Sequence, residues 1–164
     1  MTDINGLPAH ALLLHFIVVL VPLTALLLIV CALWPTARRH LVWLTLILAG
    51  ATAALTPITV NAGEWLISLH RKSTPILQEH ANRGEWMPYF SFGLLFVAIA
   101  LAVLHILERR SDKRQVAAQA VVAVLALAVG ISSMIQVYRV GDAGSQSVWG
   151  GEIAKSKKEK ENGT

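Results

Sequence analysis

Histidines and carboxylates gather near the ends of four long apolar segments of this chain. His10 and His15 open the first segment, Glu64 and His70 follow the second, and His80 precedes the third. Imidazole nitrogens bind haem iron, copper and zinc well. A histidine beside hydrocarbon is costly and usually faces the interior of a helix bundle or a cavity. These residue types therefore indicate a cofactor or metal site at one end of a membrane bundle.

The four apolar segments determine the class of protein. They cover about residues 11–34, 41–60, 89–107 and 116–137. Each is close to the roughly 20 residues that a helix needs to cross the hydrocarbon core. Hydrophobic residues make up 55% of the 164, above the roughly 45–50% of a soluble domain. We therefore expect an all-α fold, a four-helix transmembrane bundle that forms a single domain over residues 1–150.

The connecting segments carry weaker signals. Residues 61–70, with Trp65 as an aromatic anchor, predict a short interfacial amphipathic helix between the second and third helices. A polar loop is expected to follow through Pro75 to Gly84-Glu85, with Trp86 and Tyr89 in an aromatic belt at the membrane surface. A glycine-rich stretch over 141–151 follows the fourth helix. The charged tail over 151–164 is expected to be disordered.

Lysines and arginines predict the orientation. The turns that join helices one to two and three to four hold six of them, at positions 38, 39, 109, 110, 113 and 114. Positive charge concentrates on the cytoplasmic side of membrane proteins, so both termini are expected outside. The net charge of +4 fits contact with the anionic headgroups of the lipid bilayer. It gives no indication of nucleic-acid binding, because the positive residues have no aromatic residues between them.

Two kinds of site fit the histidines. A haem b between two helices needs two imidazoles as axial ligands, and His15 paired with His80 or His70 would supply them. Arg139 would then pair with a propionate. A zinc or copper site would instead gather three or four ligands from a larger set. That set consists of His10, His15, His70, His80 and Glu64.

Each of these residues also has a purely structural interpretation. The histidines at the segment ends, taken singly, are ordinary interfacial residues. His15 is harder to explain in this way, because Leu14 and Phe16 flank it in a continuous apolar run. A hydrogen bond to Glu64 or to a threonine of the second helix would nevertheless satisfy it. His40 and His105 form a weaker second pair at the opposite end.

Known enzyme motifs are missing from the sequence. It contains no G-x-S-x-G, no phosphate-binding Walker loop and no dinucleotide-binding glycine pattern. The sequence therefore favours a protein that is not an enzyme on its own. A proton or ion path normally places acids or histidines in mid-membrane, and here the middle of each segment is Val, Leu, Ala and Thr. A homo-oligomer is left open.

Several short motifs extend along most of the chain. They are Gly6-Leu7-Pro8-Ala9-His10, Leu14-His15-Phe16, Gly63-Glu64-Trp65, Glu79-His80 with Gly84-Glu85, and Gln136-Val137-Tyr138-Arg139-Val140-Gly141 leading to Trp149-Gly150. Together they resemble the bacterial membrane proteins grouped as domain of unknown function 2231. The resemblance covers about residues 6–150, and its opening and its Arg139 segment are the most specific parts.

This resemblance implies a four-helix, multi-pass protein of the bacterial inner membrane. Some similar proteins are joined to haem-bearing or iron–sulfur modules, which favours membrane redox work with an electron-transfer or membrane-complex partner. The family likeness singles out His10, His15, Glu64, His80 and Arg139.

Three positions depart from the family pattern. Ala11 and Ile17 stand where similar proteins often have proline, and Asp142 stands where many have histidine. The last change removes one candidate metal ligand.

Two functions of different class remain. The first is a small membrane redox or haem-binding subunit with its site at the outer face, in which Glu64 supports the ligands. The alternative is a non-catalytic structural or accessory subunit of a membrane complex. In that case the same polar residues close hydrogen bonds between helix ends.

Overall fold

The computed structural model describes residues 3–4, 7–68, 75–110 and 115–162. Four of its helices are long and apolar enough to cross a membrane, which confirms the predicted all-α bundle with four spans. A two-residue antiparallel ladder, β1 (Asp3–Ile4) with β2 (Leu7–Pro8), precedes them. The helices are α1 (Ala9–Leu33), α2 (Pro35–Ser68), α3 (Pro75–Gly84), α4 (Met87–Arg110) and α5 (Val116–Asn162).

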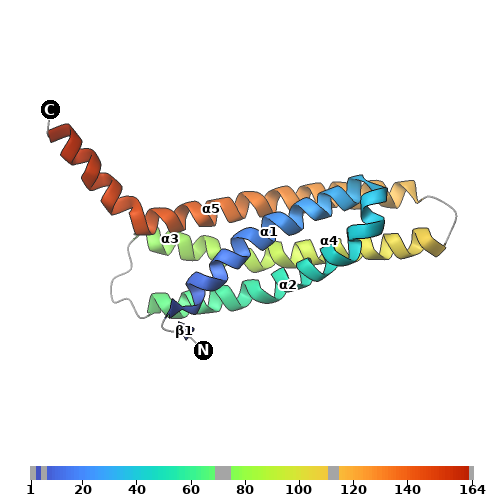
Figure 1. Cartoon of the computed structure of the whole chain (residues 1–164), viewed down its shortest axis with the longest axis horizontal. Coiled ribbons are helices and arrows are strands. Elements are labelled where there is room, and N and C mark those ends of the chain that lie inside the picture. The colour runs from blue at the N-terminus through green and yellow to red at the C-terminus, as the bar shows by residue number, and fades with distance from the viewer. Residues whose placement is uncertain (1–2, 5–6, 69–74, 111–114, 163–164) are drawn as a thin grey trace.

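The long helices run alternately up and down (Figure 1). Each of α1, α2, α4 and α5 packs against two neighbours, in the ring order α1–α2–α4–α5. The short helix α3 lies along α5 at one end of the bundle. We call this the α3 end, and the opposite end, where α1 meets α2 and α4 finishes, the Arg38 end.

Buried positions follow a seven-residue repeat along each long helix. In α2 they recur at alternating intervals of four and three residues: Arg38, Val42, Thr45, Ala49, Thr52, Thr56 and Thr59. In α4 the same spacing gives Met87, Ser91, Leu94, Ala98, Leu101 and His105. A period of 3.5 keeps one stripe of an α-helix on its partner and produces left-handed packing. The stripes are rich in small and hydroxyl residues, which let membrane helices approach closely.

Buried hydroxyls bond first to their own helix and then across the bundle. Thr52 donates to the carbonyl of Leu48 at 2.7 Å, so the contact of 3.3 Å between the Thr24 and Thr52 oxygens is one in which Thr24 donates. In the same way Thr45 donates to Leu41 and accepts from the Cys31 thiol at 3.6 Å. These side chains join α1 to α2 without leaving a polar group unbonded in a region that has no water.

Helix α2 is longer than the sequence pattern predicts at both ends. It starts at Pro35 rather than Leu41, since proline suits the first turn of a helix. It also continues to Ser68, so most of the segment 61–70 belongs to α2 and does not form the predicted separate interfacial helix. The last two residues of that segment lie outside the described part. No proline interrupts 58–68, so the backbone bonds carry on through these polar residues. A separate helix, α3, begins at Pro75 within the expected polar loop and ends at Gly84.

Helix α5 also runs past its predicted end. The pattern predicts a helix to Val137 and disorder from residue 151, whereas the structure continues one helix to Asn162. Residues 116–162 contain no proline, and the last part is rich in lysine and glutamate, which are good helix formers. Figure 1 shows this last part extending beyond the bundle.

An ion pair joins two helices at the Arg38 end. The Nη2 of Arg38 donates to both carboxylate oxygens of Glu108, at 2.9 and 2.6 Å. Arg38 is only 1% exposed and Glu108 is 21% exposed, so the pair is screened little by solvent. The start of α2 and the end of α4 are therefore held together by a largely buried charge pair.

Replacing Glu108 by alanine should strongly destabilise the bundle, because it leaves the buried Arg38 without its counter-charge. Breaking such a pair from one side costs about 3–5 kcal/mol of unfolding free energy. The double variant Arg38→Leu/Glu108→Leu should recover most of this loss. Unfolding in detergent measures both values, and Glu79→Ala, which removes an exposed pair with Arg83, is the control with a cost of about 0–1 kcal/mol. Equal losses in the single and double variants would contradict this role.

Candidate functional site

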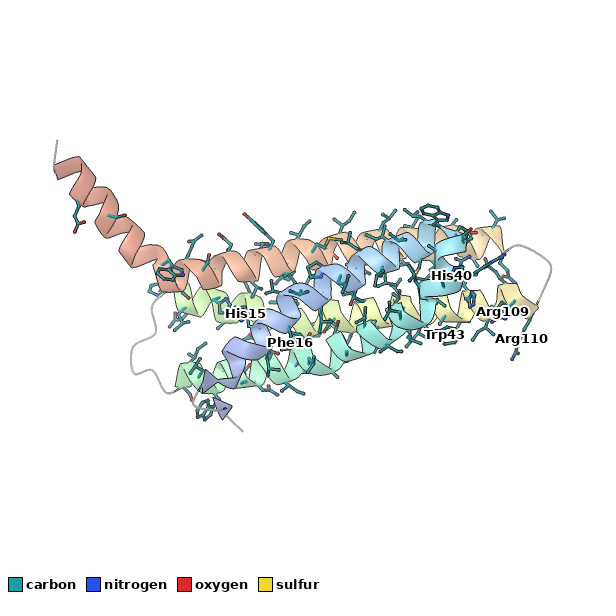
Figure 2. All side chains as sticks on the ribbon, viewed as in Figure 1. His15, Phe16, His40, Trp43, Arg109 and Arg110 are labelled. Atoms are coloured by element: carbon teal, nitrogen blue, oxygen red, sulfur yellow. The ribbon has the colours of Figure 1, made fainter. Side chains whose placement is uncertain are left out.

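The interior of the α3 end is not filled by side chains. A cavity of about 300 Å³ lies there between α1, α2, α3 and α5, and Met87 at the start of α4 also lines it. His15 from α1, Glu64 from α2 and His80 from α3 all line this cavity. Figure 2 shows His15 on α1 toward the end of the bundle that carries α3. Three residues far apart in the sequence therefore line one cavity.

His80 is held in a defined orientation. Its Nδ1 lies 3.0 Å from the carbonyl oxygen of Val140 on α5. Since a carbonyl only accepts, Nδ1 must carry the hydrogen. Histidines that bind metals usually donate one ring N–H to a carbonyl or carboxylate in this way, which fixes the ring and its tautomer. The half-buried His80 ring therefore has the arrangement that a ligating or ligand-contacting imidazole needs.

Gly144 provides the space for this ring. A Cβ atom at position 144 would lie 3.1 Å from Cε1 and 3.2 Å from Nδ1 of His80. Gly141, one turn earlier on the same helix, has no such neighbour within 4 Å. The missing side chain at 144 lets the imidazole pack against the α5 backbone and reach Val140 four residues earlier.

Further polar bonds fasten α3 to α5. Arg83 donates from Nη1 to the carbonyl of Arg139 at 3.1 Å. Gln136 donates from Nε2 to the carbonyl of Arg83 at 2.8 Å. Arg83 also pairs with Glu79 within α3. Since α3 has no buried residue of its own, these bonds and the bond from His80 position it over the cavity.

The α1 and α2 walls are more open. His15 and Glu64 line the cavity and are both exposed. Thr56 and Thr59 form part of the α2 wall, and their hydroxyls donate to the carbonyls of Thr52 and Leu55 at 2.7 and 2.8 Å. The wall is therefore apolar for the most part, with oxygens whose hydrogens are directed into the helix.

The structure brings together part of the predicted residue set. His15, Glu64 and His80 share the cavity. The side chain of Arg139 is exposed and is not among the cavity-lining residues, although its carbonyl accepts from Arg83. The side chain of His10 and the whole of His70 lie outside the described residues. Among the described residues, no three His, Cys, Asp or Glu side chains are close enough to hold a metal ion.

The opposite end places its two histidines differently. His40 is exposed, and its Nδ1 lies 3.1 Å from the carbonyl of Thr36 in its own helix. His105 is 4% exposed. Figure 2 places His40 with Trp43, Arg109 and Arg110 at the Arg38 end. Neither His40 nor His105 lines the cavity at the α3 end.

Several residues that shape the site are not among the predicted ligands. Gly144 and Val140 hold His80, and Glu85 adds a second carboxylate to the lining. Gly144 lies in the glycine-rich stretch that follows the fourth apolar segment, and small residues leave space for close packing of membrane helices. The sequence alone does not show which residue occupies that space.

The family model described as "Predicted membrane protein (DUF2231)" matches residues 6–157. The chain belongs to this family. The match includes all the lining residues of the cavity, and it confirms the resemblance of the short motifs. No curated protein and no solved structure matches the chain. The family's description as membrane proteins agrees with the four helices that are long and apolar enough to cross a membrane.

A pair of glycine substitutions tests the seat of His80. Gly141→Ala should raise the free energy of unfolding by up to about 1 kcal/mol, because alanine is the better helix former. Gly144→Ala should not show this gain, because its Cβ pushes the ring away from Val140 and costs a hydrogen bond of about 1 kcal/mol. Thermal or chemical unfolding of the two variants measures the difference. Equal effects at both positions would contradict the contact between Gly144 and His80.

Proposed function

We propose that the protein is a small redox subunit of the membrane and that the cavity at the α3 end is its redox site. The observation that supports this is the meeting of His15, Glu64 and His80 at one apolar hollow. Pockets with apolar walls and a few convergent polar groups are the usual sites of small ligands and cofactors. An electron-transfer partner or a larger membrane complex would supply the other half of the reaction.

Two kinds of redox molecule are compatible with this proposal: a resident cofactor and a diffusible ligand. We call these the first and the second form of the proposal. In the first form His15 and His80 would hold a haem b, and the bond to the Val140 carbonyl would orient His80, as is usual for metal-bound imidazoles. Haem would supply one-electron chemistry. The protein would supply two imidazoles, exclusion of water by the apolar wall, and Glu64 as a nearby acceptor. A single transition metal would instead draw its ligands from His10, His15, His70, His80 and Glu64.

One observation favours the accessory-subunit alternative. The bonds of His80, Arg83 and Gln136 to main-chain carbonyls fasten α3 whether or not anything is bound. A purely structural role for these residues predicts variants that change stability and nothing else.

The visible absorption spectrum of the purified protein tests the haem form. The protein is produced in cells supplied with haem, and spectra are taken in the air-oxidised and dithionite-reduced states with elemental analysis. The haem form predicts a sharp reduced band with about one iron per chain, lost in His15→Ala and His80→Ala and kept in His40→Ala. A colourless, iron-free protein would exclude this form. A haem band that survives in both cavity variants would contradict these ligands.

We also propose that the protein lies in the bacterial inner membrane with both termini outside, because arginines concentrate at the Arg38 end. Single cysteines in a Cys31→Ser background test this orientation. Ser156 on α5 and Thr36 on α2 are both exposed and lie toward opposite ends. A membrane-impermeant maleimide added to spheroplasts should label Ser156→Cys and should label Thr36→Cys only after lysis. The reverse pattern would contradict the orientation.

A further inference from the structure

The size of the cavity bears on which redox molecule it holds. Its volume of about 300 Å³ lies at the lower limit of the roughly 300–1,000 Å³ typical of small-molecule pockets. That volume suits one or two fused aromatic rings. Haem is a larger ring system than this, so the volume favours the smaller diffusible ligand over the resident cofactor.

The residues that line the cavity suit an apolar ring that carries few polar groups. The charged or ionisable residues in the lining are His15, Glu64, His80 and Glu85. The rest of the lining is aliphatic, methionine, glycine, threonine and serine. A ligand in this space gains from burial of apolar surface and has only a few positions for hydrogen bonds.

The polar groups of the lining are mainly acceptors. Thr56 and Thr59 donate their hydroxyl hydrogens to helix carbonyls, and Ser147 donates to the carbonyl of Gly144 at 2.7 Å. These hydroxyls therefore have no hydrogen left to donate to a ligand. Glu64 and Glu85 add carboxylates, which only accept when ionised. Such a wall favours a ligand with hydroxyl donors over one that has only carbonyl acceptors.

The cavity is also open toward the apolar surface. Val18 belongs to the span Leu13–Leu33, lines the cavity and is 42% exposed. An apolar chain attached to a bound ring can therefore leave the cavity beside α1 and continue among the lipid tails. This matches a molecule with a polar-edged ring and a long hydrocarbon tail.

From these features we infer that the cavity binds the ring of an isoprenoid quinol, with its hydroxyls facing the Glu64 side and the imidazoles of His15 and His80. The inference rests on the proposed function, because it chooses the diffusible ligand over the resident cofactor at the same site. The reduced quinol binds better than the quinone because only the quinol donates hydrogen bonds to the acceptors.

Binding to the purified full chain, stripped of native lipid in detergent, tests the inference. The probes are decylubiquinol, kept reduced under argon, and decylubiquinone, and equilibrium dialysis measures the bound ligand. We expect saturable binding of one quinol per chain and weaker binding of the quinone by about tenfold, the equivalent of roughly one 1.4 kcal/mol interaction. No saturable binding, or equal affinity for both forms, would overturn the inference.

Matched variants locate the ligand. Ala81 lines the cavity, and its neighbour Asn82 is exposed on the same helix and lies outside the lining. Ala81→Phe should abolish quinol binding and Asn82→Phe should leave it unchanged.

A second pair of variants tests the carboxylate acceptor. Glu64→Gln should weaken quinol binding about tenfold, whereas Asp142→Asn, which alters an exposed carboxylate outside the lining, should have no effect. Unfolding curves confirm that each variant is folded, and binding that is insensitive to Ala81→Phe would contradict the location.

The outcomes separate this inference from the proposed function. A stoichiometric haem band with no quinol binding would refute the quinol and retain the redox function. A colourless protein that binds quinol at the cavity supports both. A colourless protein without quinol binding, in which His15 and His80 variants change only stability, would refute both and leave the accessory subunit.

Discussion

Inside the bilayer, a polar group has no water with which to bond, so each one must find its partner within the protein. This constraint governs the packing of the whole bundle. The inward threonines of α2 donate to their own backbone, and their oxygens then accept from Thr24 and Cys31 of α1. Arg38 enters the same inward stripe, where its Nη2 donates to Glu108 of α4, while its Nε and Nη1 have no partner among the described residues. The seven-residue spacing of small and hydroxyl residues aligns these groups and lets the helices approach closely.

At the α3 end the same constraint produces the site. His80 and Arg83 of α3, which lies between the second and third apolar segments, donate to main-chain carbonyls of α5, and Gly144 leaves room for the His80 ring beside the Val140 carbonyl. Arg83 and Gln136 complete the attachment of α3. Because α3 lies along α5 rather than between α1 and α2, the interior beneath it remains hollow. The cavity and the fixed imidazole are thus two results of one docking arrangement.

The sequence predicts the spans well because a helix must be about 20 apolar residues long to cross hydrocarbon. It predicts the ends of the helices poorly. Hydropathy shows where the chain leaves the lipid, whereas the backbone hydrogen bonds of a helix can continue beyond that point. Helix α2 therefore continues through Asn61 and Glu64. The inward faces are hard to read from hydropathy, since lipid-facing and buried positions are equally apolar. The better signal is the repeat of Arg38, Thr45, Thr52 and Thr59 at intervals of seven.

Some of the candidate site residues could be predicted from the sequence, and others could not. His15 and Glu64 could be predicted at one end because each stands close to the end of an apolar segment, and His80 because the chain must return there. At position 139 the carbonyl accepts from Arg83, and the exposed side chain is not part of the cavity lining. Sequence does not show that the main chain at this position is used. The contact between Gly144 and His80 joins residues 64 positions apart, and only the helix packing brings them together.

The most direct test of this account is a nitrogen-15 NMR spectrum of the histidine side chains during titration of the purified protein with decylubiquinol. His15→Leu and His80→Leu variants assign the cavity resonances. The account predicts that His15 and His80 shift in a saturable way, with His80 protonated at Nδ1, while His40 and His105 at the opposite end do not shift. If His15 and His80 remain unchanged, or all four shift alike, the cavity at the α3 end is not the ligand site.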